Sequence, residues 1–294
     1  MGAYSGDTGA LVWIAHDNQF FDRYGLEVEL VPFEAGKLAA DALLSGQVDV
    51  ATAAEFVVVS NSFDHPDLRI IATVATANNN ELVARRDRVK SPADLAGKRI
   101  GVTRKSAGEF NLGTFLALNG LSFADVELVD LPPSGIVSAI LAGDIDAGFT
   151  WDPNVYMMSQ GLGENAISWA GQPWQQYHFV LATTERWLQE RQPAAKALLE
   201  ALLAAEQELR SNLDSSKALI ANRFDYDQHY LDYSWDRHEF RIELPQSLLV
   251  AMEDQARWRI ENGLTAGADI PDFLTTLATD PLSSLRAHSV TVIK

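Results

Sequence analysis

The sequence predicts an α/β protein made of two similar, Rossmann-like lobes. Apolar strand-like runs alternate with helical patterns, and short motifs recur in the same order at a nearly constant spacing. The run "VELV" begins at Val28 and again 98 positions later at Val126. The run "LLSGQVDVA" begins at Leu43, and its match "ILAGDIDAG" begins 97 positions later at Ile140. Self-similarity of this kind indicates a duplicated structural unit.

Each copy follows the same order of elements. A strand leads through a small-residue loop to a helix that stops at Gly, then to the "VELV" strand. A loop with Gly, Pro or both and a second helix follow, and the copy ends in the strand "VDVA" or "IDAG". Such a β-α-β-α-β series has parallel strands with right-handed crossovers.

The connections between the copies predict a hinge of two strands. Strand-like runs at Arg69–Ala75 and Glu81–Arg85 lead into the second copy, and "HFVLATT" at His178–Thr184 leads back. From Glu185 onward the pattern is largely helical. We therefore assign residues 1–83 and 180–294 to lobe 1, residues 84–179 to lobe 2, and expect a ligand cleft between them.

Composition excludes several classes of protein. The 294 residues contain 40 acidic and 23 basic side chains, a net charge of −17 that argues against a nucleic-acid partner. Without cysteine the chain has neither disulfides nor thiolate metal sites. No apolar run is long enough to span a membrane. The opening "MGAYSGDTG" lacks a basic and apolar leader, a pattern that a removed signal peptide and a cytosolic start would share.

Two nearly identical turns stand out. "TAAEF" at Thr52–Phe56 and "SAGEF" at Ser106–Phe110 each follow an apolar run and precede a helical pattern. A hydroxyl residue followed three positions later by Glu is the capping-box pattern of a helix start. Glu55 and Glu109 therefore either cap their own helices or face a ligand, and the hydroxyls of Thr52 and Ser106 are expected to be caps.

Ligands of parallel α/β units bind beyond the carboxyl ends of the strands, where helix N-termini offer free N–H groups. Four loops occupy such positions: Tyr4–Gly9, Thr52–Phe56, Thr103–Phe110 and Phe149–Pro153. The Asn run beside the hinge is a fifth candidate. We expect ligand contacts from Tyr4, Asp7, Thr8, Thr52, Glu55, Asn78, Asn79, Ser106, Glu109, Trp151 and Asp152.

Some of these residues have simpler roles open to them. Asp152 suits a helix N-cap before Pro153, whereas Trp151 at the end of a strand suits stacking on a ligand. Arg104 and Lys105 either attract an anion or are solvated surface charges. The acidic and aromatic segment "FDYDQHYLDYSWDRHEFRIELP" is interpreted as a packed connection between helices.

Catalytic signals are weak. The six histidines are scattered without metal-binding spacing, and the nucleophile-elbow, P-loop and dinucleotide motifs are absent. We therefore expect no catalytic residue, no metal and no cofactor. An enzyme that uses Asp or Glu as acid or base remains the alternative, and it would need a carboxyl group with a strongly shifted pKa. A regulatory sensor ranks last because the chain contains no output module.

Four stretches carry a resemblance to a known family: "FFDRYGLEVEL", "GQVDVATAAEF", "DLAGKRIGV" and "GDIDAGFTWDP". They resemble the substrate-binding proteins of ABC transporters in the nitrate, sulfonate, taurine and thiamine-precursor group. The resemblance implies a type 2 periplasmic-binding fold, whose two lobes close by a hinge over a small ligand. It further implies a monomer outside the cytoplasm that presents the ligand to a membrane permease.

The chain departs from this family in two respects. Glu55, Glu109 and Asp152 crowd loops that usually use N–H groups, hydroxyls and basic or neutral side chains. If these carboxylates are not used as caps, the ligand should offer N–H groups or a positive charge, as an aminosulfonate or aminopyrimidine does. The eukaryotic pyrimidine-forming relatives need a cysteine-rich motif, which this chain lacks.

Overall fold

The computed structural model describes residues 1–171 and 175–293, and the chain folds into two compact units. Unit 1 contains Met1–Ala77, Tyr177–Leu231 and His238–Lys294, and unit 2 contains Asn78–Gln176 and Asp232–Arg237. The sequence pattern predicts the boundaries near residues 83 and 180. It also assigns Asp232–Arg237 to lobe 1, whereas these residues pack in unit 2.

Unit 1 is built on a six-stranded mixed sheet with the strand order β11-β4-β10-β3-β1-β2. The strands β1, β2 and β3 are parallel, and β10 is antiparallel to both β3 and β4. The bounds are β1 Gly2–Tyr4, β2 Val31–Phe33, β3 Val50–Ala54, β4 Leu68–Ala77, β10 Tyr177–Thr184 and β11 His238–Glu243.

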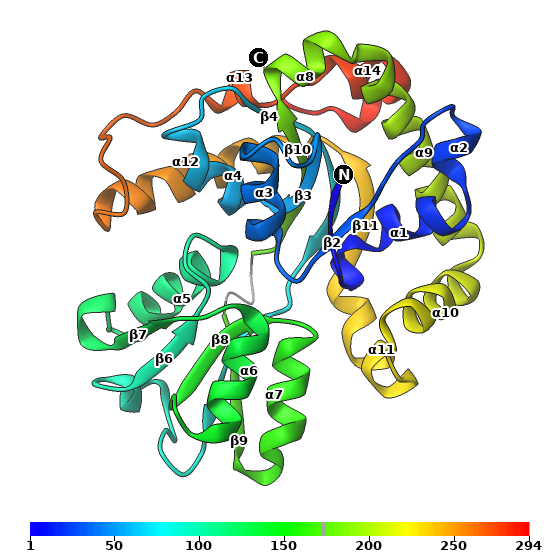
Figure 1. Cartoon of the computed structure of the whole chain (residues 1–294). Helices are drawn as coiled ribbons and strands as arrows, with labels where there is room; N and C mark the ends of the chain where they lie inside the picture. The colour runs from blue at the N-terminus through cyan, green and yellow to red at the C-terminus, as the bar shows by residue number, and fades with distance from the viewer. Residues whose placement is uncertain (172–174, 294) are drawn as a thin grey trace. The chain divides into compact units, whose positions relative to one another are not determined.

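Helices cover both faces of this sheet. Figure 1 shows α3, α4 and α12 on one side of the sheet and α1, α9 and α10 on the other. Successive residues of β10 point to opposite faces, as expected of a strand. The ring of Phe179 packs against Tyr4 on the α1 side, with ring centroids 5.7 Å apart, whereas His178 faces α4 and α12. The helices are α1 Ala10–Asp17, α2 Phe20–Arg23, α3 Gly36–Leu44, α4 Glu55–Ser62, α8 Glu185–Glu190, α9 Gln192–Ser211, α10 Leu213–Phe224, α11 Gln228–Ser234, α12 Gln246–Glu261, α13 Phe273–Thr276 and α14 Asp280–Arg286.

Unit 2 is built on a five-stranded sheet with the order β7-β6-β8-β5-β9. The bounds are β5 Asn80–Arg85, β6 Arg99–Val102, β7 Glu127–Asp130, β8 Ala147–Trp151 and β9 Ala166–Ala170, with α5 Ala107–Leu118, α6 Pro133–Ala142 and α7 Asn154–Leu162. Leu82 of β5 packs with α5, whereas its neighbour Val83 packs with α6 and α7. The sheet is therefore covered on both faces (Figure 1). Short 3-10 helices lie at Asp7–Gly9, Pro92–Leu95, Phe123–Asp125, Gly163–Asn165, Trp235–Arg237 and Ala287–Ser289.

The two sheets share one arrangement of strands. In unit 1 the first strand of the repeat lies between the second and the third (β2-β1-β3), and in unit 2 the same order appears as β7-β6-β8. An antiparallel strand adds to the third strand of each set, β10 in unit 1 and β5 in unit 2. The predicted duplication and the α/β fold class are thus confirmed. The exact position of one strand was wrong, because β2 takes in only Val31, the last residue of the first "VELV" run.

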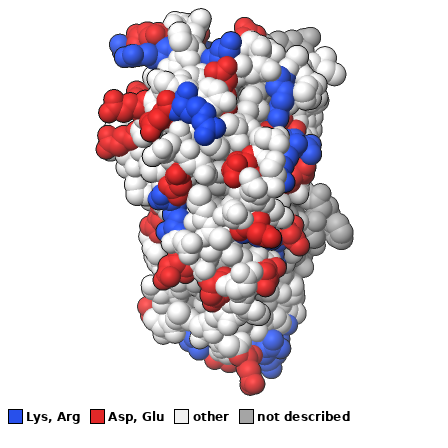
Figure 2. Space-filling view, turned by 90° about the vertical axis from the view of Figure 1, so that its right-hand side faces the viewer, with Lys and Arg blue, Asp and Glu red and all other residues white. Residues whose placement is uncertain are grey.

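Surface charge is mixed. On the face in view in Figure 2, Lys and Arg side chains are interspersed with Asp and Glu side chains. Among residues 1–171 and 175–293, no helix is both long enough and apolar enough to cross a membrane.

Candidate functional site

The predicted ligand residues of unit 1 gather at one end of its sheet. The carboxyl ends of β1, β3 and β4 lie there together with the amino ends of β10 and β11, because Phe179 pairs with Ala54 and both Tyr177 and His238 pair with Ala77. We call this region, made of Tyr4–Gly9, Thr52–Glu55, Tyr177–His178 and His238, the unit 1 edge.

Thr52 holds two strands of the unit 1 edge together. Its Oγ1 accepts a hydrogen bond from the backbone N–H of Tyr4 at 2.8 Å, and the side chain is fully buried. Thr52 is still within β3, and the N-cap of α4 is Ala54, which provides no side-chain bond. The predicted helix cap at Thr52 was therefore wrong, because the strand continues two residues beyond it.

Asp7 and Thr8 form a buried polar cluster with residues from distant parts of the chain. The Asp7 carboxylate accepts hydrogen bonds from the Tyr230 hydroxyl at 2.6 Å and from the Thr8 N–H at 2.9 Å. The Thr8 hydroxyl lies 3.0 Å from Nε2 of His238 and 3.5 Å from the hydroxyl of Tyr177. Nε2 of His238 is also 3.6 Å from Asp7. Among the described residues, no lysine or arginine pairs with this carboxylate.

Glu55 is a buried carboxyl group that contacts only neutral donors. It receives hydrogen bonds from Nε2 of Gln255 at 2.8 Å and from the backbone N–H of His178 at 3.0 Å. In the described part of the chain it makes no ion pair. Burial raises the pKa of Glu55 to about 7, although these hydrogen bonds and the N–H groups of Glu55 and Phe56 oppose the shift.

The imidazole beside Glu55 is neutral at ordinary pH. Burial lowers the pKa of His178 to about 4. Within the described residues, Nδ1 of His178 and Oε1 of Gln255 are both buried without a hydrogen-bond partner. Both residues contact Glu55 through other atoms, Gln255 through Nε2 and His178 through its backbone N–H.

The predicted residues of unit 2 also share one end of their sheet. Asn80 at the start of β5 pairs with Trp151 at the end of β8, and β6 ends nearby at Val102. We call the residues Asn78–Asn80, Thr103–Glu109, Trp151–Asp152 and Arg237 the unit 2 edge. Nearly all the predicted residues here are buried, and Asn78 is partly exposed.

Ser106 caps α5 as predicted. Its Oγ accepts the N–H of Gly108 at 3.1 Å and donates to the carbonyl of Thr103 at 2.7 Å. The Glu109 carboxylate accepts the N–H of Lys105 at 2.9 Å and pairs with the Arg104 guanidinium. Glu109 thus stabilises the turn before its own helix, and Arg104 is its counterion.

Asp152 is fully buried and is also used inside the unit. Its carboxylate accepts the N–H of Tyr156 at 3.3 Å in the first turn of α7 and lies 3.5 Å from Nη1 of Arg237. The capping role predicted for Asp152 is therefore present, one residue before the N-cap position at Pro153. The ring of Trp151 lies over the start of α5, where a Cβ added to Gly108 would be 3.7 Å from it.

The sequence pattern did not point to six residues that belong to the two edges or contact them: Tyr177, His178, Tyr230, Arg237, His238 and Gln255. Tyr230, Arg237 and His238 belong to the acidic and aromatic segment that was interpreted as a packed connection. Its density of chemistry-bearing side chains was a usable signal. Gln255 gave no such signal, because it lies within a long amphipathic helix.

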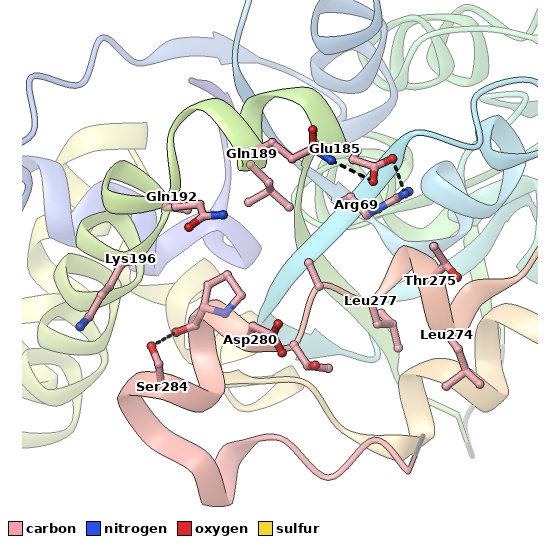
Figure 3. Close-up of a pocket in the computed structure, with 15 residues that line it drawn as sticks. Arg69, Glu185, Gln189, Gln192, Lys196, Leu274, Thr275, Leu277, Asp280 and Ser284 are labelled. Carbon is pink, nitrogen blue, oxygen red and sulfur yellow. Dashed lines mark hydrogen bonds and ion pairs between the residues drawn. The ribbon is translucent and has the colours of Figure 1, made fainter.

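A hollow of about 790 Å³ lies in unit 1 at the opposite end of β4 from the unit 1 edge (Figure 3). Arg69 Nη2 donates to Glu185 at 2.8 Å, and Gln189 Nε2 donates to the same carboxylate at 3.2 Å. The charged pair on its wall is therefore satisfied within the protein. We place the candidate site at the two edges instead.

Comparison with known proteins gives the family. The model of the NMT1/THI5-like family matches residues 9–214. The chain belongs to the NMT1/THI5-like family. The resemblance seen in the sequence motifs is thus confirmed.

Among the described residues, no group of three or more His, Asp and Glu side chains is arranged to hold a metal ion.

Relatives of known structure or function include binding proteins and one enzyme. The chain is 29% identical over 139 residues to the taurine-binding periplasmic protein of Escherichia coli K12. This alignment covers 47% of the chain and only 43% of that relative. The alkanesulfonate-binding protein SsuA of Xanthomonas axonopodis pv. citri, solved with MOPS, has a TM-score of 0.82 at 20% identity over 95% of this chain and 96% of its own. The desulfurization enzyme DSZB has a TM-score of 0.66 at 18% identity over 98% of this chain and 99% of its own. These likenesses confirm the periplasmic-binding-protein fold.

Proposed function

We propose that this protein is the solute-binding component of an ABC importer, and that residues of the unit 1 and unit 2 edges bind a small sulfonate or a similar small anion or zwitterion. The main support is the position of the eleven predicted residues, all of which lie at the edges where the strands of each unit end. Family membership and the taurine- and alkanesulfonate-binding relatives agree with it.

The pairing of the carboxylates favours this ligand class over a cation. Asp7, Glu55, Glu109 and Asp152 each accept hydrogen bonds within their own unit. A carboxylate that is already satisfied does not require a positively charged ligand. The expectation that these acids call for a cationic group is thereby weakened, and the helix N-termini and amides of the edges favour an anion.

Import by an ABC transporter also requires a membrane permease and a location outside the cytoplasm. We propose that the protein acts as a monomer outside the cytoplasm and delivers its solute to a membrane permease. No cofactor enters this function.

Ligand screening tests the proposal. Thermal unfolding with taurine, ethanesulfonate and nitrate should reveal a solute that raises the melting temperature, because a ligand at a hundred times its Kd stabilises the folded state by about 2.7 kcal/mol. Small-angle scattering with that solute should give a smaller radius of gyration. If none of the three stabilises the protein, the ligand class is wrong.

An enzyme remains the second candidate, because Glu55 has the strongly raised carboxyl pKa that acid–base catalysis would use. Against it, Glu55 is only 1% exposed and both of its oxygens accept hydrogen bonds from the protein. Incubation of the protein with its stabilising solute, followed by product analysis, decides between them. A binding protein returns the solute unchanged.

A further inference from the structure

Arg237 lies where the chain passes from unit 2 back to unit 1. It is the last residue of Asp232–Arg237, the short segment that packs in unit 2, and the next residue, His238, begins β11 in unit 1. The backbone carbonyl of Arg237 accepts the N–H of Asn78 at 3.0 Å. Arg237 is therefore joined through its backbone to one of the predicted ligand residues.

The side chain of Arg237 gathers two carboxylates. Its Nη1 lies 2.6 Å from Oε1 of Glu81 and 3.5 Å from Oδ2 of Asp152, and the guanidinium stacks over the ring of Tyr233 at 4.2 Å from the centroid. The Asp152 side chain is fully buried and that of Glu81 is 12% exposed. This cation thus stands against two nearly buried anions.

The pKa values of Tyr233 and Arg237 reflect the negative charges of Asp152 and Glu81. Burial and the charges of Asp152 and Glu81 raise the pKa of Tyr233. Burial lowers the pKa of Arg237, but the two carboxylates outweigh it and leave the pKa above its usual value. Without the guanidinium, Asp152 and Glu81 would lose this positive partner and the region beside Trp151 and Asn78 would become more negative, so an approaching anion would be repelled more strongly.

We infer that Arg237 is a positioning residue that sets the charge preference of the unit 2 edge, because it holds Asp152 and Glu81 and so allows an anionic solute to bind there. This inference rests on the proposed function. Arg237 thus influences specificity indirectly, through its contacts with Asp152 and Glu81, and not by contacting the solute.

Two solutes of nearly the same shape test the charge preference. Ethanesulfonate carries a negative charge and ethanesulfonamide does not, so the ratio of their Kd values measures selectivity for charge. In an Arg237→Gln variant, calorimetry should give ethanesulfonate binding about tenfold weaker, as expected for one uncompensated charge acting through partly screened protein. Binding of ethanesulfonamide should change less than about twofold.

Two further variants separate charge from scaffolding. Arg237→Lys should recover part of the lost selectivity, because it restores the positive charge without the forked geometry. Adding Asp152→Asn to Arg237→Gln should also recover ethanesulfonate binding, because it removes one of the two nearly buried negative charges that Arg237 balances. A purely structural role for Arg237 predicts no recovery from the second change.

Arg88 provides a matched control in the same unit. Its side chain is 34% exposed against 27% for Arg237, and its Nη1 donates to Asp146 at 2.8 Å, just before the amino end of β8. Arg88→Gln should therefore leave the ratio of the two Kd values unchanged. Equal losses for both solutes in Arg237→Gln, or no loss in either, would overturn the inference while the proposed function stands. If the wild-type protein binds neither solute, the sulfonate class of the proposed function fails and the inference with it.

Discussion

The two similar turns "TAAEF" and "SAGEF" carry the same pattern but do different work. In unit 2 the strand β6 ends four residues before Ser106, so the hydroxyl caps α5 and Glu109 lies in the third position of that helix. In unit 1 the strand β3 continues through Thr52 to Ala54, and Glu55 is the first residue of α4. Two residues of extra strand therefore convert a helix cap into a link between strands.

The same difference changes how the two acids are stabilised. Glu109 bonds within its own turn and has Arg104 as a counterion. Glu55 instead reaches across to Gln255 on α12 and to His178 on β10, both of which are neutral. The unit 2 edge thus compensates Glu109 and Asp152 with arginines, whereas Glu55 at the unit 1 edge is held by neutral hydrogen-bond donors. A sequence motif alone does not determine which solution a chain adopts.

The largest effect expected from this difference is on the pH dependence of the free energy of unfolding. The pKa of Glu55 is about 7 in the folded state against 4.5 for an ordinary glutamate, so its contribution is fully present below about pH 4.5 and is lost as the pH rises through 7. The loss amounts to about 3 kcal/mol. Glu55→Gln should remove this loss, so that urea unfolding at pH 5 and pH 8 changes less than in the wild-type protein.

Glu253→Gln is a suitable baseline for that measurement, because it makes the same replacement at an exposed position of α12. If wild-type protein and Glu55→Gln show parallel stability between pH 5 and 8, then Glu55 is ionised throughout that range. In that case a charged group must compensate it, and the contrast between the units disappears.

A smaller effect is expected from the hydroxyl of unit 1. Thr52→Val keeps the shape of the side chain but removes the acceptor of the buried Tyr4 N–H. An unsatisfied buried N–H group costs about 1–3 kcal/mol, and chemical denaturation should show a loss of about 2 kcal/mol. Thr52→Ser should regain most of it. Equal stability of the valine variant and the wild type would show that this bond is dispensable.

The smallest effect is expected from the hydroxyl of unit 2. Ser106→Ala removes the cap of α5 and should cost about 1 kcal/mol by the same measurement. Because Asn is also a good N-cap, Ser106→Asn should restore stability, whereas Thr52→Asn should not. Restoration at both positions, or at neither, would contradict the assignment of one as a cap and the other as a link.

The sequence was sufficient for features that depend on local pattern. The repeated motifs predicted the order of strands and helices in each unit, and most candidate residues lie at strand ends, where the loops after the strands put them. The cap at Ser106 follows from its own turn. These predictions need only neighbouring residues, whose preferences act over a few positions.

Contacts between distant residues were out of reach. Glu55 meets Gln255, 200 residues later in the chain, and Asp7 meets Tyr230 after 223 residues. No periodicity or spacing records which side chains such folding brings together. The cap expected at Thr52 failed for a related reason, because the length of β3 depends on its pairing with β10.

Ala77 and Tyr177 are cross-strand partners, so the entire stretch Asn78–Gln176 departs from unit 1 and rejoins it at neighbouring points of one sheet. In architectural terms it is an insert in a β-hairpin, and a tight turn of a few residues would span the gap it leaves. Removing the insert would leave Arg237 without its acidic partners Glu81 and Asp152, so the segment Asp232–Arg237, which packs in unit 2, depends on the insert.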